Sequence, residues 1–185
     1  MTLNEFFSLV PKAAVAFSGG TDSAFLLWAA RECGCDVRAY YVKTAFQPQF
    51  ELEDAHRLAS ELEVPMTVVE ADILAVPEAA ANGPQRCYHC KTALFSQLRQ
   101  AAREDGYTVL LDGTNASDDA GDRPGMRALR ELEVRSPLRE CGLPSFGQEW
   151  LDQISGDYSG QNIRDYLSAI DDVAKEPWVD KDRLG

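Results

Sequence analysis

Short apolar runs alternate with helix-like patterns along most of the chain. The apolar runs have the length of buried strands and cover residues 13–18, 37–43, 66–72, 108–113 and 134–138. Apolar side chains at helical spacing cover residues 21–34, 50–64, 90–106 and 124–132. Strands that alternate with helices in this way form βαβ units. The sequence therefore predicts an α/β fold with a five-stranded parallel sheet and helices on both faces.

The pattern changes after Leu143, which predicts a domain over 1–143 and a separate extension over 144–185. The extension carries two shorter helical patterns, around 147–154 and 160–174, and its charges are mostly acidic. We expect a short helical tail that covers a sheet edge. A lid or a contact between copies in a homo-oligomer are the alternatives.

The composition is that of a globular protein, with 45% hydrophobic and 26% charged residues. A net charge of −12 disfavours a general nucleic-acid surface, which needs basic side chains to neutralise phosphates. No stretch reaches the roughly 18 apolar residues of a membrane span, and the N-terminal segment lacks the basic start of a signal peptide. We therefore expect a cytoplasmic protein with a small-molecule partner. Without a secretory signal, the five cysteines predict free thiols rather than disulfides.

Three polar clusters follow predicted strands, at Ser18–Ser23, Lys43–Thr44 and Asp112–Asp119. The carboxyl ends of parallel strands share one edge of a sheet, and ligands of such sheets bind there. We expect the three clusters to converge on one ligand crevice.

The cluster "SGGTDS" joins a predicted strand to a predicted helix. The first N–H groups of a helix lack helical acceptors and favour an anion. Gly19 and Gly20 allow close approach of the backbone to a phosphate, and Ser18 and Ser23 add hydroxyl groups. An ordinary glycine turn is the alternative to a phosphate site.

Two further side chains of this cluster have other expected roles. Thr21 is expected to cap the helix. Asp22 would repel a bare phosphate, so it either faces a Mg²⁺ ion or orients the loop.

The "SGGTDS" motif resembles the PP-loop of the ATP pyrophosphatases, which have the adenine nucleotide alpha hydrolase-like fold. Three more segments, "RCYHCK" (86–91), "LDGTNASDDAGDRPGMRAL" (111–129) and "VRSPLRECGL" (134–143), resemble one branch of that superfamily. That branch contains the LarE-type ATP-dependent sacrificial sulfur transferases.

The resemblance implies that ATP adenylates a small carboxylate, a pyridinium dicarboxylate mononucleotide in the family, and that pyrophosphate leaves. It implies nucleotide contacts from Ser18, Gly19, Gly20, Thr21, Asp22, Ser23, Lys43, Thr44, Gly113, Thr114 and Asn115. Asp22, Ser23 and Arg123 are the candidate catalytic residues. Arg123 and Arg86 would bind the acidic substrate, with structural ion pairs as the alternative. Asp118, Asp119 and Asp122 would hold Mg²⁺, with a solvated acidic loop as the alternative.

In this family a protein cysteine supplies the sulfur, and this cysteine lies in a C-terminal domain. Beyond Leu143 the present sequence does not resemble that domain. Cys141 is a speculative substitute. Cys87 and Cys90 could form half of a metal site, act as a redox or sulfur-carrying pair, or pack while their polar neighbours carry the function. The alternatives to sulfur transfer are tRNA thiolation, amidation, or nucleotide binding without turnover.

Overall fold

The computed structural model describes residues 1–118 and 123–145, and the predicted tail helices lie outside them. The chain divides into two units, Met1–Phe146 and Gly147–Gly185. The described elements are α1 (Leu3–Leu9), β1 (Lys12–Ala16), α2 (Thr21–Glu32), β2 (Asp36–Lys43), α3 (Gln49–Glu61), β3 (Met66–Glu70), the 3₁₀ turn η1 (Ile73–Ala75), α4 (Pro77–Ala80), α5 (Arg86–Glu104), β4 (Leu110–Leu111), α6 (Pro124–Glu131) and α7 (Pro137–Glu140). Within these ranges, no helix is both long and apolar enough to pass through a lipid bilayer.

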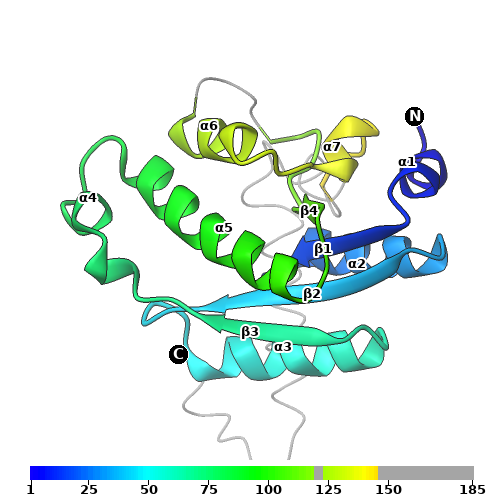
Figure 1. Cartoon of the computed structure of the whole chain (residues 1–185), viewed down its shortest axis with the longest axis horizontal. Coiled ribbons are helices and arrows are strands. Elements are labelled where there is room, and N and C mark those ends of the chain that lie inside the picture. Colours follow the sequence, from blue (N-terminus) through cyan, green and yellow to red (C-terminus); the bar gives the residue numbers. More distant parts are fainter. Residues whose placement is uncertain (119–122, 146–185) are drawn as a thin grey trace, which may run out of the picture. The chain divides into compact units, whose positions relative to one another are not determined.

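The strands form a parallel sheet in the order β3-β2-β1-β4 (Figure 1). The chain moves outward from β1 through β2 to β3 and then returns to the other side of β1. The strand order therefore reverses beside β1, and ligands of open α/β sheets bind at that position, beyond the carboxyl ends of the strands.

Helices cover both faces of the sheet, as the sequence predicted (Figure 1). On one face, Leu26 and Leu27 of α2 and Ala55 of α3 belong to the larger core cluster, which also contains Val15 of β1. On the other face, Leu98 of α5 packs with Ala14 and Tyr40. Burying apolar surface on both sides holds the strand ends, and with them the site, in fixed positions.

The sheet of the described residues has four strands, so the prediction of a fifth strand at 134–138 was wrong. That segment makes only a single bridge, between Leu111 and Arg135. Pro137 then starts α7, because a proline lacks the N–H that a strand must donate but fits the first turn of a helix. The segment therefore meets the sheet edge and turns away from it.

Candidate active site

The loop between β1 and α2 is braced by its own serine side chains. The Ser23 hydroxyl donates to the Gly20 carbonyl (2.9 Å) and lies 3.2 Å from the Ser18 hydroxyl, which accepts from the Gly20 N–H (3.3 Å). Gly19 has φ +79°, a left-handed conformation that favours glycine. The first helical hydrogen bond runs from the Ala24 N–H to the Gly20 carbonyl, so the N–H groups of the first turn have no acceptor within α2. The loop is a rigid frame with backbone donors suited to an anion.

Thr21 differs from its expected role, whereas the contacts of Asp22 agree with the loop-orienting alternative. The N-cap of α2 is Gly20, which makes no side-chain cap, so Thr21 is the first helical residue and not the cap. The Asp22 carboxylate accepts hydrogen bonds from the Asn115 amide (3.0 Å) and the Ser145 hydroxyl (3.1 Å). Asp22 therefore joins the loop to the segment that follows β4.

Gly113, directly after β4, packs against the first turn of α2. A Cβ atom at this position would lie 3.0 Å from the Ser23 nitrogen and 3.1 Å from the Ser23 Cα atom. Asn115 is only 5% exposed, and its amide oxygen accepts from the Ser117 N–H (2.8 Å). The structure thus brings two of the three predicted polar clusters together, as the sequence indicated.

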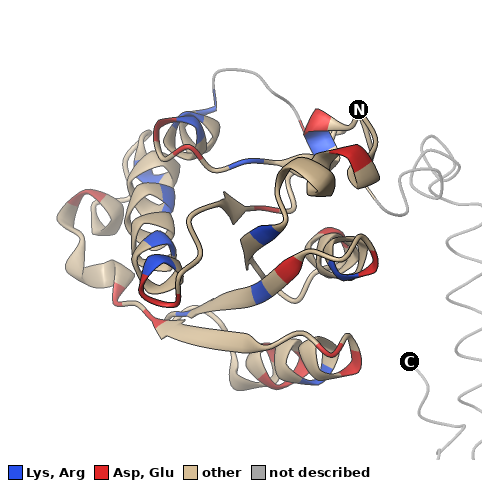
Figure 2. Cartoon of the chain, turned by 45° about the vertical axis from the view of Figure 1, so that its right-hand side comes forward, with Lys and Arg blue, Asp and Glu red and all other residues tan. Residues whose placement is uncertain are grey.

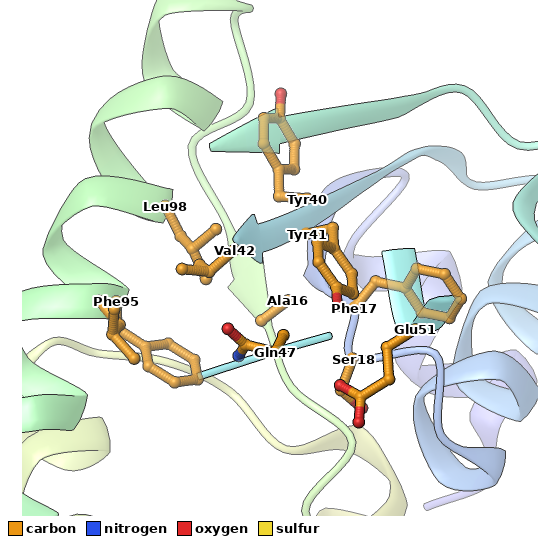
Figure 3. Close-up of a pocket in the computed structure, with 11 residues that line it drawn as sticks. Ala16, Phe17, Ser18, Tyr40, Tyr41, Val42, Gln47, Glu51, Phe95 and Leu98 are labelled. Atoms are coloured by element: carbon orange, nitrogen blue, oxygen red, sulfur yellow. The ribbon is translucent and has the colours of Figure 1, made fainter. Parts of the chain in front are cut away.

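A pocket of about 250 Å³ adjoins the first residue of the loop (Figure 3). It is lined by Ala16, Phe17, Ser18, Tyr40, Tyr41, Val42, Gln47, Glu51, Leu94, Phe95 and Leu98. We call it the loop pocket. Of the predicted site residues only Ser18 lines it. Tyr41 and Phe95 sit in apolar patterns that look like core, so the sequence carried no signal for a pocket at these positions.

Lys43 and Thr44 are not in the lining of the loop pocket; they line another hollow together with Glu70 and Asp72. The Thr44 N–H and hydroxyl both donate to the Gln47 side-chain oxygen, at 2.9 and 2.6 Å. The Lys43 ammonium donates to the Gln47 backbone carbonyl. Both predicted nucleotide contacts therefore orient Gln47, which does line the pocket.

A second pocket, of about 360 Å³, lies beyond β4 and between α5 and α6. It is lined by Cys87, Lys91, Thr114, Asp118, Arg123, Pro124, Gly125 and Met126. We call it the cationic pocket, after Lys91 and Arg123. A Cβ atom at Gly125 would lie 3.1 Å from the Lys91 Cδ atom, so the absence of a side chain at Gly125 leaves room for the lysine. Two cationic side chains in one hollow suit an acidic ligand.

One face of α5 lines both pockets. Cys87 and Lys91 face the cationic pocket, and Leu94, Phe95 and Leu98 face the loop pocket. Residues three and four apart lie on the same side of a helix, so these five side chains form one stripe. Because α5 begins at Arg86, four residues before the predicted start at 90, the whole stripe is helical.

The other polar residues of the "RCYHCK" segment point elsewhere. Arg86 is exposed, donates to the Asn82 side chain (3.0 Å), and is absent from the lining of the cationic pocket. The Tyr88 hydroxyl donates to Glu131 (2.6 Å), and Arg127 stacks over the Tyr88 ring. These contacts tie α5 to α6, whereas Lys91 is the polar residue of this segment that reaches the pocket.

The cysteines differ in exposure. Cys87 is exposed and lines the cationic pocket, and Cys90 is half-buried. Among the described residues, no three His, Cys, Asp or Glu side chains gather as metal ligands, so the pair has no partners there for a metal site. Cys141 packs against the larger core cluster, and burial raises the pKa of its thiol. Its position favours a packing role over the donor role suggested by the sequence.

Alkylation should separate these thiols. Burial, together with the negative charge of Asp36, raises the pKa of Cys35 to about 11, so little thiolate forms there at neutral pH. We expect iodoacetamide at pH 7.5 to modify Cys87 first and Cys35 at least about 100-fold more slowly, as measured by peptide mass spectrometry. Equal rates at the two positions in folded protein would contradict the buried placement of Cys35.

Oxygen ligands suited to Mg²⁺ also face the cationic pocket. The Asp118 carboxylate accepts from the Asn115 N–H (2.9 Å) through one oxygen, and both Asp118 and Thr114 line the pocket. Hard oxygen donors of this kind fit a magnesium ion. Asp119 and Asp122, the other predicted ligands, lie outside the described residues.

A parallel α/β sheet with a Ser-Gly-Gly-x-Asp-Ser loop at its strand-order reversal defines an ATP pyrophosphatase domain. The family model for the queuosine biosynthesis protein QueC matches residues 12–94. An uncharacterised protein of Synechocystis sp. is 34% identical over 158 residues, covering 83% of this chain and 58% of that protein. The pyridinium-3,5-bisthiocarboxylic acid mononucleotide synthase of Lactiplantibacillus plantarum is 33% identical over 132 residues, covering 70% of this chain and 48% of that protein.

A solved structure shows the same fold. The NMN synthetase of Francisella tularensis superposes with a TM-score of 0.51 at 15% identity, covering 62% of this chain and 52% of that one. The chain belongs to the PP-loop ATP pyrophosphatase superfamily of enzymes, and within it the chain is LarE-like. It spans about half the length of the curated PP-loop relatives it matches.

A separate match concerns a short stretch of the chain. Over 52 residues, 28% of this chain, the sequence is 66% identical to part of dipeptidyl-peptidase 5 of Porphyromonas gingivalis, of which it covers 8%. This stretch is far too small a part of the peptidase to carry over its activity.

Proposed function

We propose that this protein uses ATP to adenylate a small carboxylate substrate in the cytoplasm, with release of pyrophosphate. One observation carries the proposal: one pocket adjoins the braced PP-loop, and a second adjoins the segment after β4 that packs on this loop. The loop pocket includes Ser18, the first loop residue, and the cationic pocket includes Thr114, next to the Gly113 that contacts Ser23. The first pocket suits a nucleoside, and the second suits an acid.

The chemistry requires little more than positioning. The substrate carboxylate, held by Lys91 and Arg123, would attack the α-phosphorus of ATP, and the bond from that phosphorus to the pyrophosphate oxygen would break. The backbone donors at the start of α2 would stabilise the leaving pyrophosphate. Asp118 and Thr114 would hold Mg²⁺, which neutralises charge on the polyphosphate. Asp22 would keep the loop fixed against Asn115 during the reaction, so we assign it a positioning role.

Sulfur transfer is the outcome we propose for the activated carboxylate. The support is the similarity to a synthase whose name specifies a bisthiocarboxylic acid product. The exposed Cys87 lines the same pocket as Arg123 and is better placed than Cys141 for such chemistry. A sulfur-donating cysteine would lose its Cβ–Sγ bond and become dehydroalanine, which mass spectrometry detects.

We also propose that the PP-loop domain ends near Leu143 and that 144–185 is a separate extension of it. The division of the chain after Phe146 supports this boundary. For this extension we propose one of two roles: it covers an edge of the sheet, or it forms a contact between copies of the chain.

Product analysis tests the central step. With Mg²⁺, ATP and the pyridinium dicarboxylate mononucleotide, we expect AMP and pyrophosphate in equal amounts, and little of either without the carboxylate. Arg123→Ala should lower the rate by about 100-fold, because a charged contact to the reacting acid is lost. Chromatographic separation of AMP, ADP and ATP gives the readout.

Arg130→Ala is the matched control, since Arg130 is an exposed arginine of α6, the helix that Arg123 precedes as N-cap, and is absent from the pocket lining. It should keep the wild-type rate within about twofold. ADP instead of AMP as the product, or equal losses in both variants, would contradict the proposed reaction.

A further inference from the structure

The loop pocket has two unlike halves (Figure 3). Ala16, Val42, Phe95 and Leu98 line an apolar half next to α5, whereas Ser18, Tyr41 and Glu51 gather in a polar half next to the PP-loop. Gln47 lies between the two halves. A nucleoside has the same division, with a flat apolar base and a sugar that carries hydroxyl groups.

Tyr41 is the unusual member of the polar half. Its side chain is 2% exposed, and its buried hydroxyl has no hydrogen-bond partner in the part of the chain that the structure describes. Buried hydroxyl groups in native proteins nearly always have a partner, so this hydroxyl needs an explanation. Because Tyr41 lines the pocket, a ligand there could supply the missing acceptor.

Glu51 provides the complementary group. It is an exposed carboxylate in the first turn of α3 and lines the same half of the pocket. Burial and the negative charge of Glu51 both raise the pKa of Tyr41, so the tyrosine stays protonated and acts as a donor at neutral pH. The polar half therefore offers one donor and one acceptor side by side.

We propose that Tyr41 and Glu51 bind the ribose hydroxyls of ATP and make the protein selective for ribonucleotides. A ribose hydroxyl can donate to the Glu51 carboxylate and accept from the Tyr41 hydroxyl, whereas a deoxyribose lacks one such group. The sugar of ATP lies between the base and the phosphates, and the polar half, which includes Ser18 of the PP-loop, adjoins the apolar half. Acidic side chains bind ribose hydroxyls in other nucleotide sites for the same chemical reason.

This inference rests on the proposed function only in taking ATP as the ligand. The test is calorimetric binding of ATP, 2′-deoxy-ATP, 3′-deoxy-ATP and GTP to the full chain and its variants, without turnover. We expect wild type to bind ATP about tenfold more tightly than at least one deoxy analogue. Tyr41→Phe and Glu51→Gln should each weaken ATP binding about five- to tenfold and remove most of that preference.

Tyr107→Phe is the matched control, because its hydroxyl donates to Asp36 (3.0 Å) and the residue does not line the pocket. It should keep the ribose preference. Tyr41→Phe should also unfold at a higher temperature than wild type when no nucleotide is present, since it removes an unsatisfied buried hydroxyl. A purely structural tyrosine would show the opposite shift and no change in preference.

The outcomes separate the two proposals. No binding of ATP by wild type would overturn the proposed function together with this inference. ATP binding without discrimination against either deoxy analogue would overturn the inference alone. If Tyr41→Phe lost the preference for ATP over GTP but kept the ribose preference, the pair would contact the base, and the inference would also fail.

Discussion

Gly113→Ala is expected to weaken ATP binding by at least about tenfold and to lower the free energy of unfolding by about 1–3 kcal/mol. The added methyl group would lie 3.0 Å from the Ser23 nitrogen and 3.1 Å from its Cα atom. Both are backbone atoms in the first turn of α2, so no side-chain rotation can relieve the contact. The helix start or the end of β4 must move, which displaces the anion-binding N–H groups. Calorimetric titration with ATP and chemical denaturation measure the two effects.

Gly83→Ala provides the comparison for Gly113→Ala. A Cβ atom at Gly83 has no neighbour within 4 Å, and Gly83 is not among the glycines with positive φ. This variant should bind ATP and unfold as wild type does. Wild-type ATP affinity in Gly113→Ala would show that the close packing of β4 on the loop does not set the geometry of the nucleotide site.

Asp22→Ala is expected to lower the rate of AMP formation by about 100-fold or more. The substitution removes the acceptor of the Asn115 amide, a buried group that then lacks its partner at 3.0 Å. An unsatisfied buried amide costs about 1–3 kcal/mol, so stability should also fall. Single-turnover kinetics at saturating ATP separates the chemical step from weakened binding.

A double-mutant cycle with Asn115→Ala tests the cause of this effect. If the contact between Asp22 and Asn115 is responsible, the double variant should lose little more activity than either single variant. Ser145→Ala removes the hydrogen bond from the Ser145 hydroxyl to the carboxylate, at 3.1 Å, and should have a smaller effect because Ser145 is only partly buried. Additive losses for Asp22 and Asn115 would show that the two residues act independently.

The sheet and the loop were predictable because their signals are local. Buried strands read as continuous apolar runs, and "SGGTDS" places all its functional atoms within six residues. The prediction of a fifth strand was wrong for an equally local reason. Pro137 starts α7 and ends the extended segment, in spite of the apolar pattern before it. Helix α1 was missed, although Thr2 and Glu5 form a capping box whose spacing could have indicated it.

The pockets were harder to predict because tertiary packing assembles them. Tyr41 comes from β2, Glu51 from α3 and Phe95 from α5, and no sequence spacing connects these positions. Lys43 and Thr44 were expected at the nucleotide because they follow a strand; both form hydrogen bonds to Gln47, and Gln47 is the residue that lines the loop pocket. A sequence shows which strand end a residue occupies, but not which of its neighbours reaches the ligand.

The shared stripe on α5 fixes the distance between the two proposed ligand sites. From Cys87 to Leu98 the helix advances about 16 Å, at about 1.5 Å per residue, and a helix packed along its length changes this distance very little. A larger substrate therefore cannot be accommodated by sliding one pocket away from the other. If the proposed sites are correct, adaptation to a new acid must come from α6 and the segment after β4, while the proposed nucleotide pocket is unchanged. Recognition of the acid and recognition of the nucleotide could therefore change independently in evolution, although α5 lines both pockets.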